Sequence, residues 1–283
     1  MANASQEIDC LQKRWRKVDA DRLLRDLTAE GRCTSPFGEI DGRQDLRGIA
    51  WPSPSIFKSL KIENIDFSHS NIKKLLLIDS HFAGIALGHS KAVILCNNSR
   101  VANCNFAHAR LRTSGSTGNA RWENCNFEKA DLKGCIFHRG SFIHCSFDAA
   151  VIDGIEFGTS LLDSCKIGAA IRKTFFRGPI RQCDLSLASF NDCAFYGATF
   201  SDCAFPTDAI HFKQWQASFF EIKQSFEADT LSNEASEALR TLMAVWEKLE
   251  GTIVQQVIDR RNLVRQYGAS AGQEIFAYMR KYA

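Results

Sequence analysis

The amino-acid sequence predicts a mainly β solenoid in which each turn of the chain has four sides, with helices at both ends. Three observations predict it: bulky apolar residues recur at every fifth position, small residues precede them by two positions, and phenylalanine is in surplus, with 21 residues against four tyrosines. A period of five fits neither an α-helix nor a β-strand. It fits a chain that turns a corner every five residues and places one large and one small side chain inside each time.

The bulky positions form four runs that are separated by breaks in the register. The longest run is Trp122, Phe127, Leu132, Phe137, Phe142, Phe147, Ile152, Phe157, Leu162 and Ile167. The other runs begin at Ile62, Val101 and Phe175, and the last one ends at Phe205. Four corners close one coil, so we expect about six to seven coils stacked at about 4.8 Å, a rod roughly 30 Å long. The breaks predict bulges or short loops.

The order small-x-bulky is clear in Ala130-Asp131-Leu132-Lys133-Gly134 and in Cys125-Asn126-Phe127-Glu128-Lys129. These motifs closely resemble the pentapeptide-repeat family, whose consensus is roughly Ala-Asp/Asn-Leu-x-x, and the resemblance covers about residues 61–205. It implies the right-handed quadrilateral β-helix of that family. The predicted fold class is therefore mainly β: a right-handed quadrilateral (pentapeptide-repeat) β-helix solenoid with an N-terminal helix and a C-terminal α-helical region.

Three domains follow from where the repeats begin and end. We expect an N-terminal helix and irregular cap over residues 1–60, the pentapeptide-repeat β-helix over 61–205, and a C-terminal α-helical cap or assembly region over 206–283. Caps are expected because the first and last coils of a solenoid each lack one neighbour to cover them.

The two ends carry helical patterns. Residues 5–30 have the spacing of an amphipathic helix, with Gly31 as its stop. In the C-terminal region we expect helices over 232–250, with Ser232 or Asn233 as cap, over 252–267 and over 271–282. The apolar stripe of the first of these is the candidate surface for a homodimer, and it consists of Leu239, Leu242, Trp246 and Leu249.

The eleven cysteines are the obvious candidates for chemistry. In register, Cys125, Cys145 and Cys165 fall on one side of successive coils and Cys135 on the opposite side, all in the small inward slot, where a thiol acts as a compact apolar group. Cys104 lies outside this regular ladder. No Cys-x-x-Cys pair exists, and no histidine lies at ligand spacing from two cysteines. We therefore expect no metal and no other cofactor.

Sequence motifs for catalysis and for membrane insertion are missing as well. There is no nucleophile elbow, no phosphate-binding loop and no metalloprotease helix, so we expect no catalytic residues and no enzymatic activity. The first thirty residues are charged throughout, and no apolar stretch approaches the length of a membrane span. The expected protein is cytoplasmic, has reduced thiols and makes no membrane contact.

Charged residues separate along the repeats. Acids dominate residues 123–164, and each of those singled out here directly follows a bulky inward position. The candidate acidic surface consists of Glu123, Glu128, Asp148, Asp153 and Asp163. Residues 166–181 carry no acid and supply the candidate basic surface, which consists of Arg172, Lys173, Arg177 and Arg181.

The sequence favours a rigid, non-catalytic scaffold that binds a protein partner of unknown identity through its flat β faces. The resemblance implies an alternative, because family members that protect DNA gyrase are thought to imitate the charge and width of duplex DNA. This chain would then be a DNA-mimic regulator or protector of a type II topoisomerase or of another DNA-handling enzyme. A continuous acidic stripe over four or more coils would favour mimicry. Nucleic acid is not expected as a partner, because the net charge of +3 is small and no exposed aromatic residues interleave the basic segments.

Overall fold

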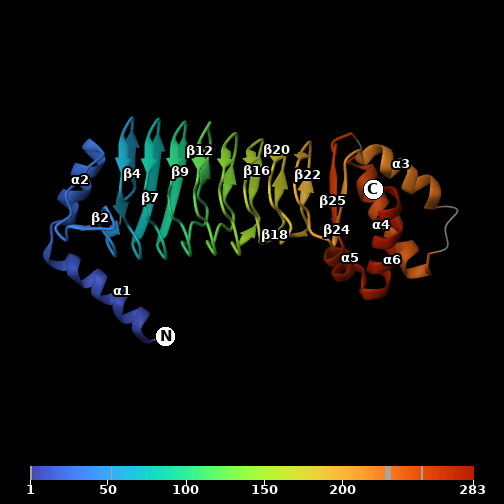
Figure 1. Cartoon of the computed structure of the whole chain (residues 1–283), viewed down its shortest axis with the longest axis horizontal. Helices are drawn as coiled ribbons and strands as arrows, with labels where there is room; N and C mark the ends of the chain where they lie inside the picture. The colour runs from blue at the N-terminus through green and yellow to red at the C-terminus, as the bar shows by residue number, and fades with distance from the viewer. Residues whose placement is uncertain (1, 52, 227–230, 250) are drawn as a thin grey trace.

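The computed structural model describes residues 2–51, 53–226, 231–249 and 251–283. Figure 1 shows a straight rod of stacked coils, with helices at its N-terminal end and a compact helical body at its C-terminal end. The chain runs around four sides in each coil, and we name these sides A, D, B and C in the order in which the chain visits them.

Sides B and C are the two long sheets of the rod. On side B the strands are β4 (Ser55–Lys58), β7 (Asn71–Ile78), β9 (Lys91–Asn97), β11 (Gly115–Ser116), β13 (Ile136–Phe137), β16 (Glu156–Gly158), β19 (Phe175–Phe176) and β22 (Ala194–Phe195). On side C they are β5 (Lys61–Glu63), β8 (His81–Ala83), β10 (Arg100–Ala102), β12 (Arg121–Glu123), β14 (Ser141–Ile143), β17 (Leu161–Asp163), β20 (Pro179–Arg181) and β23 (Thr199–Ser201). Neighbouring strands pair in parallel.

Sides A and D are narrower, and single bridges hold much of them. Side A has β1 (Glu39–Ile40), β2 (Arg43–Asp45) and β6 (Ile65–Asp66), and its bridges continue from Asp66 to Ala204. Side D has β3 (Ala50–Trp51), the beginnings of β7 and β9, bridges from Lys91 to Val151, and then β15 (Ile152–Asp153), β18 (Ala170–Arg172) and β21 (Ser189–Asn191).

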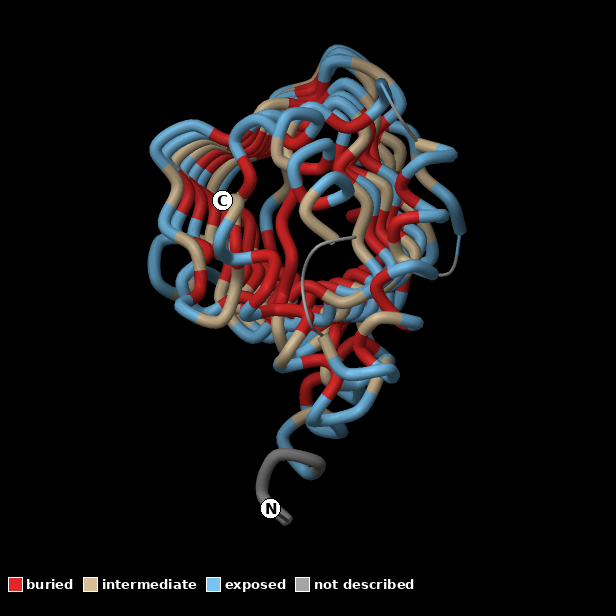
Figure 2. The backbone as a smooth tube through the Cα atoms, turned by 90° about the vertical axis from the view of Figure 1, so that its right-hand side faces the viewer, coloured by how far each residue is buried: buried red, intermediate tan, exposed pale blue. Residues whose placement is uncertain are grey.

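The inside of the rod is filled as the five-residue period predicts. Figure 2, a view along the rod, shows buried segments lining the interior of the coils. Phe106, Phe127 and Phe147 stack along the axis with ring centroids 4.9 and 5.0 Å apart. Corner residues such as Lys129, at φ 54°, have left-handed backbone, which asparagine, histidine and glycine adopt most readily. The core therefore consists of columns of identical positions, one per coil.

The number of coils differs from the prediction. Side C has one strand in each of eight coils, where six to seven coils were predicted. The seven steps between the first and the last coil make the rod roughly 34 Å long at about 4.8 Å per step. The additional coil comes from residues 43–60, which were expected to be irregular, although the sequence also allowed a first coil to start at Asp45-Leu46-Arg47-Gly48-Ile49. Here Leu46 and Phe57 take the bulky inward positions. The regular ladders thus begin before residue 61, while the division into three domains stays a prediction.

Two assignments within the repeats were wrong. Phe175 was placed inward, but it is 42% exposed, and its neighbour Phe176 fills the slot at 3%. The reason is that coil seven is short: Leu162 on side C pairs with Ile180, only eighteen residues later. Cys104 was placed outside the cysteine ladder, but it is buried in the same inward column as Cys125.

The N-terminal end has two helices where one was predicted. They are α1 (Ala2–Arg14), continued by the 3₁₀ turn η1 (Trp15–Lys17), and α2 (Ala20–Glu30). The chain breaks between them because the Asp19 side chain caps α2 by accepting the Arg22 N–H. The predicted stop is confirmed, with Gly31 in the left-handed conformation at φ 74°. Buried Leu23, Leu24 and Leu27 of α2 join the core at this end of the rod.

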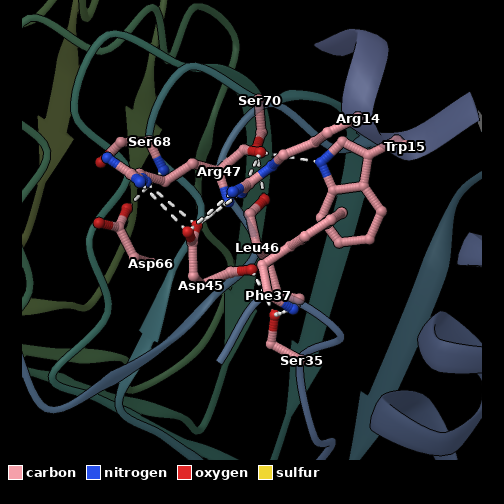
Figure 3. A network of polar contacts seen from close by, with 10 residues as sticks. All are labelled: Arg14, Trp15, Ser35, Phe37, Asp45, Leu46, Arg47, Asp66, Ser68 and Ser70. Atoms are coloured by element: carbon pink, nitrogen blue, oxygen red, sulfur yellow. Dashed lines mark hydrogen bonds and ion pairs between the residues drawn. The ribbon is translucent and has the colours of Figure 1, made fainter. Parts of the chain in front are cut away.

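A buried carboxylate ties these helices to the first coil (Figure 3). Asp45 accepts hydrogen bonds from the Arg14 guanidinium at 2.6 and 2.8 Å and from Arg47 at 3.1 Å. Trp15 donates its indole N–H to the Arg47 carbonyl at 2.8 Å, and the Ser35 hydroxyl donates to the Asp45 carbonyl at 2.6 Å. Burial acts to raise the pKa of Asp45, but the hydrogen bonds from Arg14 and Arg47 outweigh it and hold this pKa well below the ordinary value.

Replacing Asp45 by asparagine should therefore destabilise the protein at neutral pH by about 2 kcal/mol, because two arginines lose an ionised acceptor. A carboxyl whose pKa is lowered by folding stabilises the folded state above its unfolded pKa of about 3.9, and this stabilisation is lost as the pH falls below that value. Urea unfolding between pH 7 and pH 2.5 should show the gap between wild type and Asp45→Asn closing in acid. A gap that stays constant would contradict the ionic origin of the tie.

The C-terminal body contains β24 (Ala209–Phe212), α3 (Trp215–Phe226), α4 (Asn233–Glu247), β25 (Gln256–Asp259), α5 (Arg260–Tyr267), α6 (Ala269–Met279) and the 3₁₀ turn η2 (Arg280–Tyr282). Ser232 caps α4, as expected, by accepting the Ala235 N–H. The helix predicted over 252–267 was wrong in its first half, because β25 pairs antiparallel with β24 there. No helix had been predicted over α3.

This body also covers the last coil of the rod. The Asp259 carboxylate accepts the Phe190 N–H at 2.9 Å, and the Gln255 side-chain oxygen accepts the Phe200 N–H at 2.7 Å. The Thr252 carbonyl accepts the Gly197 N–H at 2.8 Å. Backbone donors that would face a ninth coil are thereby satisfied within the chain.

Candidate functional site

The cysteines form a structural ladder inside side A. Its members are Cys104, Cys125, Cys145, Cys165, Cys183 and Cys203. Cys125 shows the arrangement, with Sγ 3.5 Å from the Val101 carbonyl and 3.3 Å from that of Glu123. On the opposite side burial raises the pKa of Cys135 to about 12, so this thiol is unreactive at neutral pH. Among the described residues, no three histidines, cysteines or acids are placed to hold a metal ion.

The candidate acidic residues lie on three sides of the rod. Glu128 and Asp148 stack one coil apart on side A, Asp153 lies on side D, and Glu123 and Asp163 lie on side C. The ladder registers of the described residues place acids in at most two successive coils of any one column. The acids therefore form no stripe of the length that DNA mimicry was expected to need.

Most of these acids are also neutralised by partners. Glu128 pairs with Lys129 at 2.8 Å, Asp148 with Lys166 at 2.5 Å and Asp153 with Lys133 at 3.6 Å. Glu123 is held by two arginines; the hydrogen bond from Arg100 is 2.6 Å long, and Arg121 binds the other oxygen. Burial acts to raise the pKa of Glu123, but these arginines outweigh it and lower the pKa. Asp163 accepts a hydrogen bond from the Ser164 hydroxyl at 3.0 Å.

The candidate basic residues are separated in the same way. Arg172 and Lys173 follow one another on side D of coil seven. Arg181 lies on side C, where it is the register partner of Asp163. Arg177 extends over the ring of Tyr196, with its guanidinium carbon 5.9 Å from the ring centroid. Only the first two residues share a surface.

Leu239, Leu242 and Trp246 of the candidate assembly surface lie on α4, and Leu249 lies in the turn after it; all four face the core of the C-terminal body. Leu239 and Trp246 are buried there, and Leu242 and Leu249 are partly buried against the same cluster. Trp246 packs edge-on against Trp215 of α3, with ring centroids 5.0 Å apart. The large apolar residue that this helix exposes is Val245, at 51%.

A cavity of about 620 Å³ opens beside this aromatic cluster. Trp215, Phe219 and Ile253 are among its lining residues, and a 2.5 Å ion pair between Lys223 and Glu247 lies in the same lining. The cavity depends on α3, so it could not be foreseen without that helix. Its lining has an apolar floor and one neutralised charge pair, which is typical of packing between helices.

Side B carries a surface that the sequence analysis missed. One outward column contains Ile56, Leu76, Leu95, Ile136 and Phe175, and we call this set the apolar ladder. Gly115 and Glu156 occupy the two interrupting positions in that column. Ile56, Leu76, Ile136 and Phe175 each directly precede a bulky inward residue, and Leu95 precedes the buried Cys96, so the signal was present in the sequence. It is hidden in the sequence because the members lie about twenty residues apart.

The outward aromatic residues of side B extend this surface toward the C-terminal end. Tyr196, one coil beyond Phe175, stacks on it with ring centroids 6.2 Å apart. Arg177 covers the ring of Tyr196, as described above. The three side chains form a cluster of the residue types that are enriched in protein interfaces.

No helix among the described residues has the length and apolar character required to cross a membrane. Comparison with known proteins identifies the repeat. The family model for pentapeptide repeats, which comprises eight copies of the repeat, matches residues 118–148. No curated protein matches the chain.

Solved structures that resemble the chain include HetL, a pentapeptide repeat protein involved in heterocyst differentiation regulation from the cyanobacterium Nostoc sp. (14% identity, 65% of this chain, 95% of that chain, TM-score 0.31). They also include QnrB1, a plasmid-mediated fluoroquinolone resistance protein (19% identity, 57% and 70%, TM-score 0.29). A third is Rfr23, a pentapeptide repeat protein from a Cyanothece cyanobacterium (17% identity, 52% and 93%, TM-score 0.21). With its five-residue register, its parallel four-sided coils and its match to the repeat model, this chain is a pentapeptide-repeat protein.

Proposed function

We propose that this protein is a non-catalytic scaffold that binds a protein partner through side B of its rod. The apolar ladder is the observation that carries the proposal. Three of its members are large and strongly exposed: Ile56 at 58%, Ile136 at 47% and Phe175 at 42%. Aligned apolar side chains of this size on a soluble protein mark interaction sites more often than chance exposure does.

The surroundings of the ladder suit a protein interface. Lys58, Arg139 and Glu156 lie on side B or at its corner and provide both signs of charge around an apolar centre. The sheet is held on both sides by its neighbours, so binding orders little backbone, and the entropic cost of association is small. From Ile56 to Phe175 the ladder spans six coil steps, roughly 29 Å. That length can engage the flat face of a folded domain.

The ends of the rod are covered by parts of the same chain, which favours binding through its sides. Helix α2 packs at the first coil, and the C-terminal body satisfies the donors of the last one. A partner therefore meets the sides of the rod. Homodimerisation through α4 would have to use Val245, because Leu239 and Trp246 are buried in their own chain. The eleven free cysteines fit a reducing compartment such as the cytoplasm.

Protection of a topoisomerase by DNA mimicry has less support. It requires acids stacked over several coils on one side, whereas here they are divided among sides A, C and D and mostly paired. The apolar ladder has no counterpart in duplex DNA, whose surface is charged throughout.

The test compares two substitutions of equal exposure. Ile136→Glu places a charge in the ladder, and Val151→Glu places one on side D, where the native side chain is 45% exposed. Both should unfold within about 0.5 kcal/mol of wild type, since neither residue is buried. In affinity purification from the native host with mass spectrometry, one protein should be recovered with wild type and Val151→Glu and fall at least tenfold with Ile136→Glu. Equal recovery with both variants would exclude side B.

A further inference from the structure

Four unpaired basic side chains gather on side D of coils two to four. Lys91 and Arg110 are register partners in adjacent coils, about 4.8 Å apart along the rod. Asn71 precedes them in the same column, and Lys73 and Lys74 lie two and three residues after Asn71 on β7. Lys73, Lys91 and Arg110 are exposed, and Lys74 is half-buried. We call Lys73, Lys74, Lys91 and Arg110 the cationic patch.

The patch differs from other basic positions of the rod in how its charges are paired. Lys129, Lys133 and Lys166 each pair with a carboxylate within 4 Å. Within the described part of the chain, none of the four patch residues has an ion pair. The outward residues of side D in these three coils include no acid. The nearest acid on this side is Asp131, the register partner of Arg110 in the next coil, and Arg112 already binds it at 2.6 Å. Four positive charges thus remain uncompensated on one flat surface.

Three histidines border the patch at the corner between sides A and D. His69, His89 and His108 are stacked with ring centroids 5.1 and 4.5 Å apart, and both interplanar angles are 7°. All three have left-handed backbone, with φ between 56° and 62°. Because the rings cover one another, both faces of His89 are occupied. Ring edges, with their nitrogen atoms, are therefore what this column offers to a ligand.

We infer that the cationic patch and the histidine column bind the phosphodiester backbone of duplex nucleic acid. Repeated, uncompensated cations at regular spacing match a ligand with repeated single negative charges. Exposed bases of a single strand would require free aromatic faces for stacking, and here those faces are covered. Imidazole edges can instead donate hydrogen bonds to phosphate oxygens. Contacts of this kind position a duplex without reading its sequence.

This inference goes against the expectation from the sequence that nucleic acid is not a partner. That expectation rested on the small net charge and on the lack of aromatic residues near basic ones. The fold answers the first ground by gathering four cations on one side of the rod, and the second does not apply to a duplex, whose backbone is bound without base stacking. The site is independent of the apolar ladder, which lies on side B.

Acidic pH should strengthen the binding. Burial, followed by the neighbouring His108 and His69, lowers the pKa of His89, which favours the neutral form of this middle ring in the free protein. The charged groups nearest the histidine column lie on both adjoining sides and at its end. They are Asp66 and Glu128 on side A, Lys91 and Arg110 on side D, and Lys129, which takes the same corner position in the next coil. A phosphate backbone favours the protonated ring, so affinity should rise as the pH falls from 7.5 to 5.5. His89→Asn with His108→Asn, which tolerate the same backbone, should remove that rise.

Fluorescence anisotropy with a labelled 30-base-pair duplex DNA of random sequence tests the inference with the full chain. For four phosphate contacts, the logarithm of the binding constant should fall against the logarithm of salt concentration with a slope of about −3.5. This corresponds to a roughly 100-fold loss of affinity between 50 and 200 mM salt. The triple variant Lys73→Gln, Lys91→Gln and Arg110→Gln should reduce the slope by about one per residue.

A triple variant with the same loss of charge serves as the control. Lys58→Gln, Arg139→Gln and Arg181→Gln change exposed side chains on other parts of the rod and should leave the slope unchanged. Equal loss in both triples would overturn the inference, because binding would then follow net charge alone. No saturable binding at 50 mM salt would also overturn it. So would equally tight, patch-dependent binding of polyglutamate, which would assign the patch to an acidic protein surface.

Discussion

Replacing Phe137 by alanine should lower the free energy of unfolding by about 3–5 kcal/mol. The ring is 2% exposed and lies among Phe142, Phe157 and Trp122, with centroid distances of 5.0, 5.8 and 6.1 Å. Ladder hydrogen bonds fix the coils above and below, so the backbone cannot move inward to fill the space. The cost therefore includes the lost burial of the ring and the cavity that remains.

The adjacent residue provides a matched control. The His138 side chain is 44% exposed and is 3.8 Å from Glu156. His138→Ala should therefore cost less than about 0.5 kcal/mol. Urea unfolding followed by circular dichroism measures both variants. If the two midpoints moved by the same amount, the inward and outward positions of this coil would have been assigned incorrectly.

Replacing Asp259 by alanine should cost about 3 kcal/mol and expose the end of the rod. This carboxylate is 1% exposed, accepts the Phe190 N–H at 2.9 Å and binds the Arg261 guanidinium at 3.0 and 3.1 Å. Without it a buried backbone donor of the last coil loses its acceptor, and an arginine loses its counter-charge. Unpaired strand edges readily pair with other chains, so the variant should also associate at high concentration.

Asp192→Ala is the control for the cap. Asp192 accepts hydrogen bonds from Arg265 at 3.1 Å and Gln266 at 2.9 Å, but it is exposed, and its loss should cost less than about 1 kcal/mol. Calorimetry gives the stability difference, and light scattering gives the state of association. A monomeric Asp259→Ala protein with wild-type stability would mean that α5 and β25 hold the last coil without this carboxylate.

The repeat could be predicted because burial imposes it on single positions. A side chain such as Phe127 must be large and apolar wherever the coil passes that corner, so the period is visible without any long-range information. Register at the short coil could not be predicted, because Phe175 and Phe176 fit the slot equally well. Phe176 takes the slot in the short coil, and two residues later Gly178 passes so close to the chain below that a Cβ atom would lie 2.1 Å from the Ser160 carbonyl oxygen.

The surfaces could not be predicted, because neighbours on a side are distant in the sequence and the coils differ in length. Register partners on side C are 21 residues apart at Arg100 and Arg121, and 18 apart at Leu162 and Ile180. Steps of five residues therefore do not predict on which side of the rod a residue lies. Acids that are close in the sequence fall on different sides. Strand β25 was missed for a related reason: its partner, β24, lies more than forty residues earlier.

The separate caps have a consequence for how this protein can change over generations. Each coil stacks on its neighbours and adds the same rise, about 4.8 Å, while α2 packs at the first coil and the C-terminal body at the last one. Gain or loss of one whole coil in the middle would alter the distance between the two ends by one such step and leave both ends intact. The rod is in this respect an adjustable spacer, whose length can be tuned in small increments without redesigning what it separates.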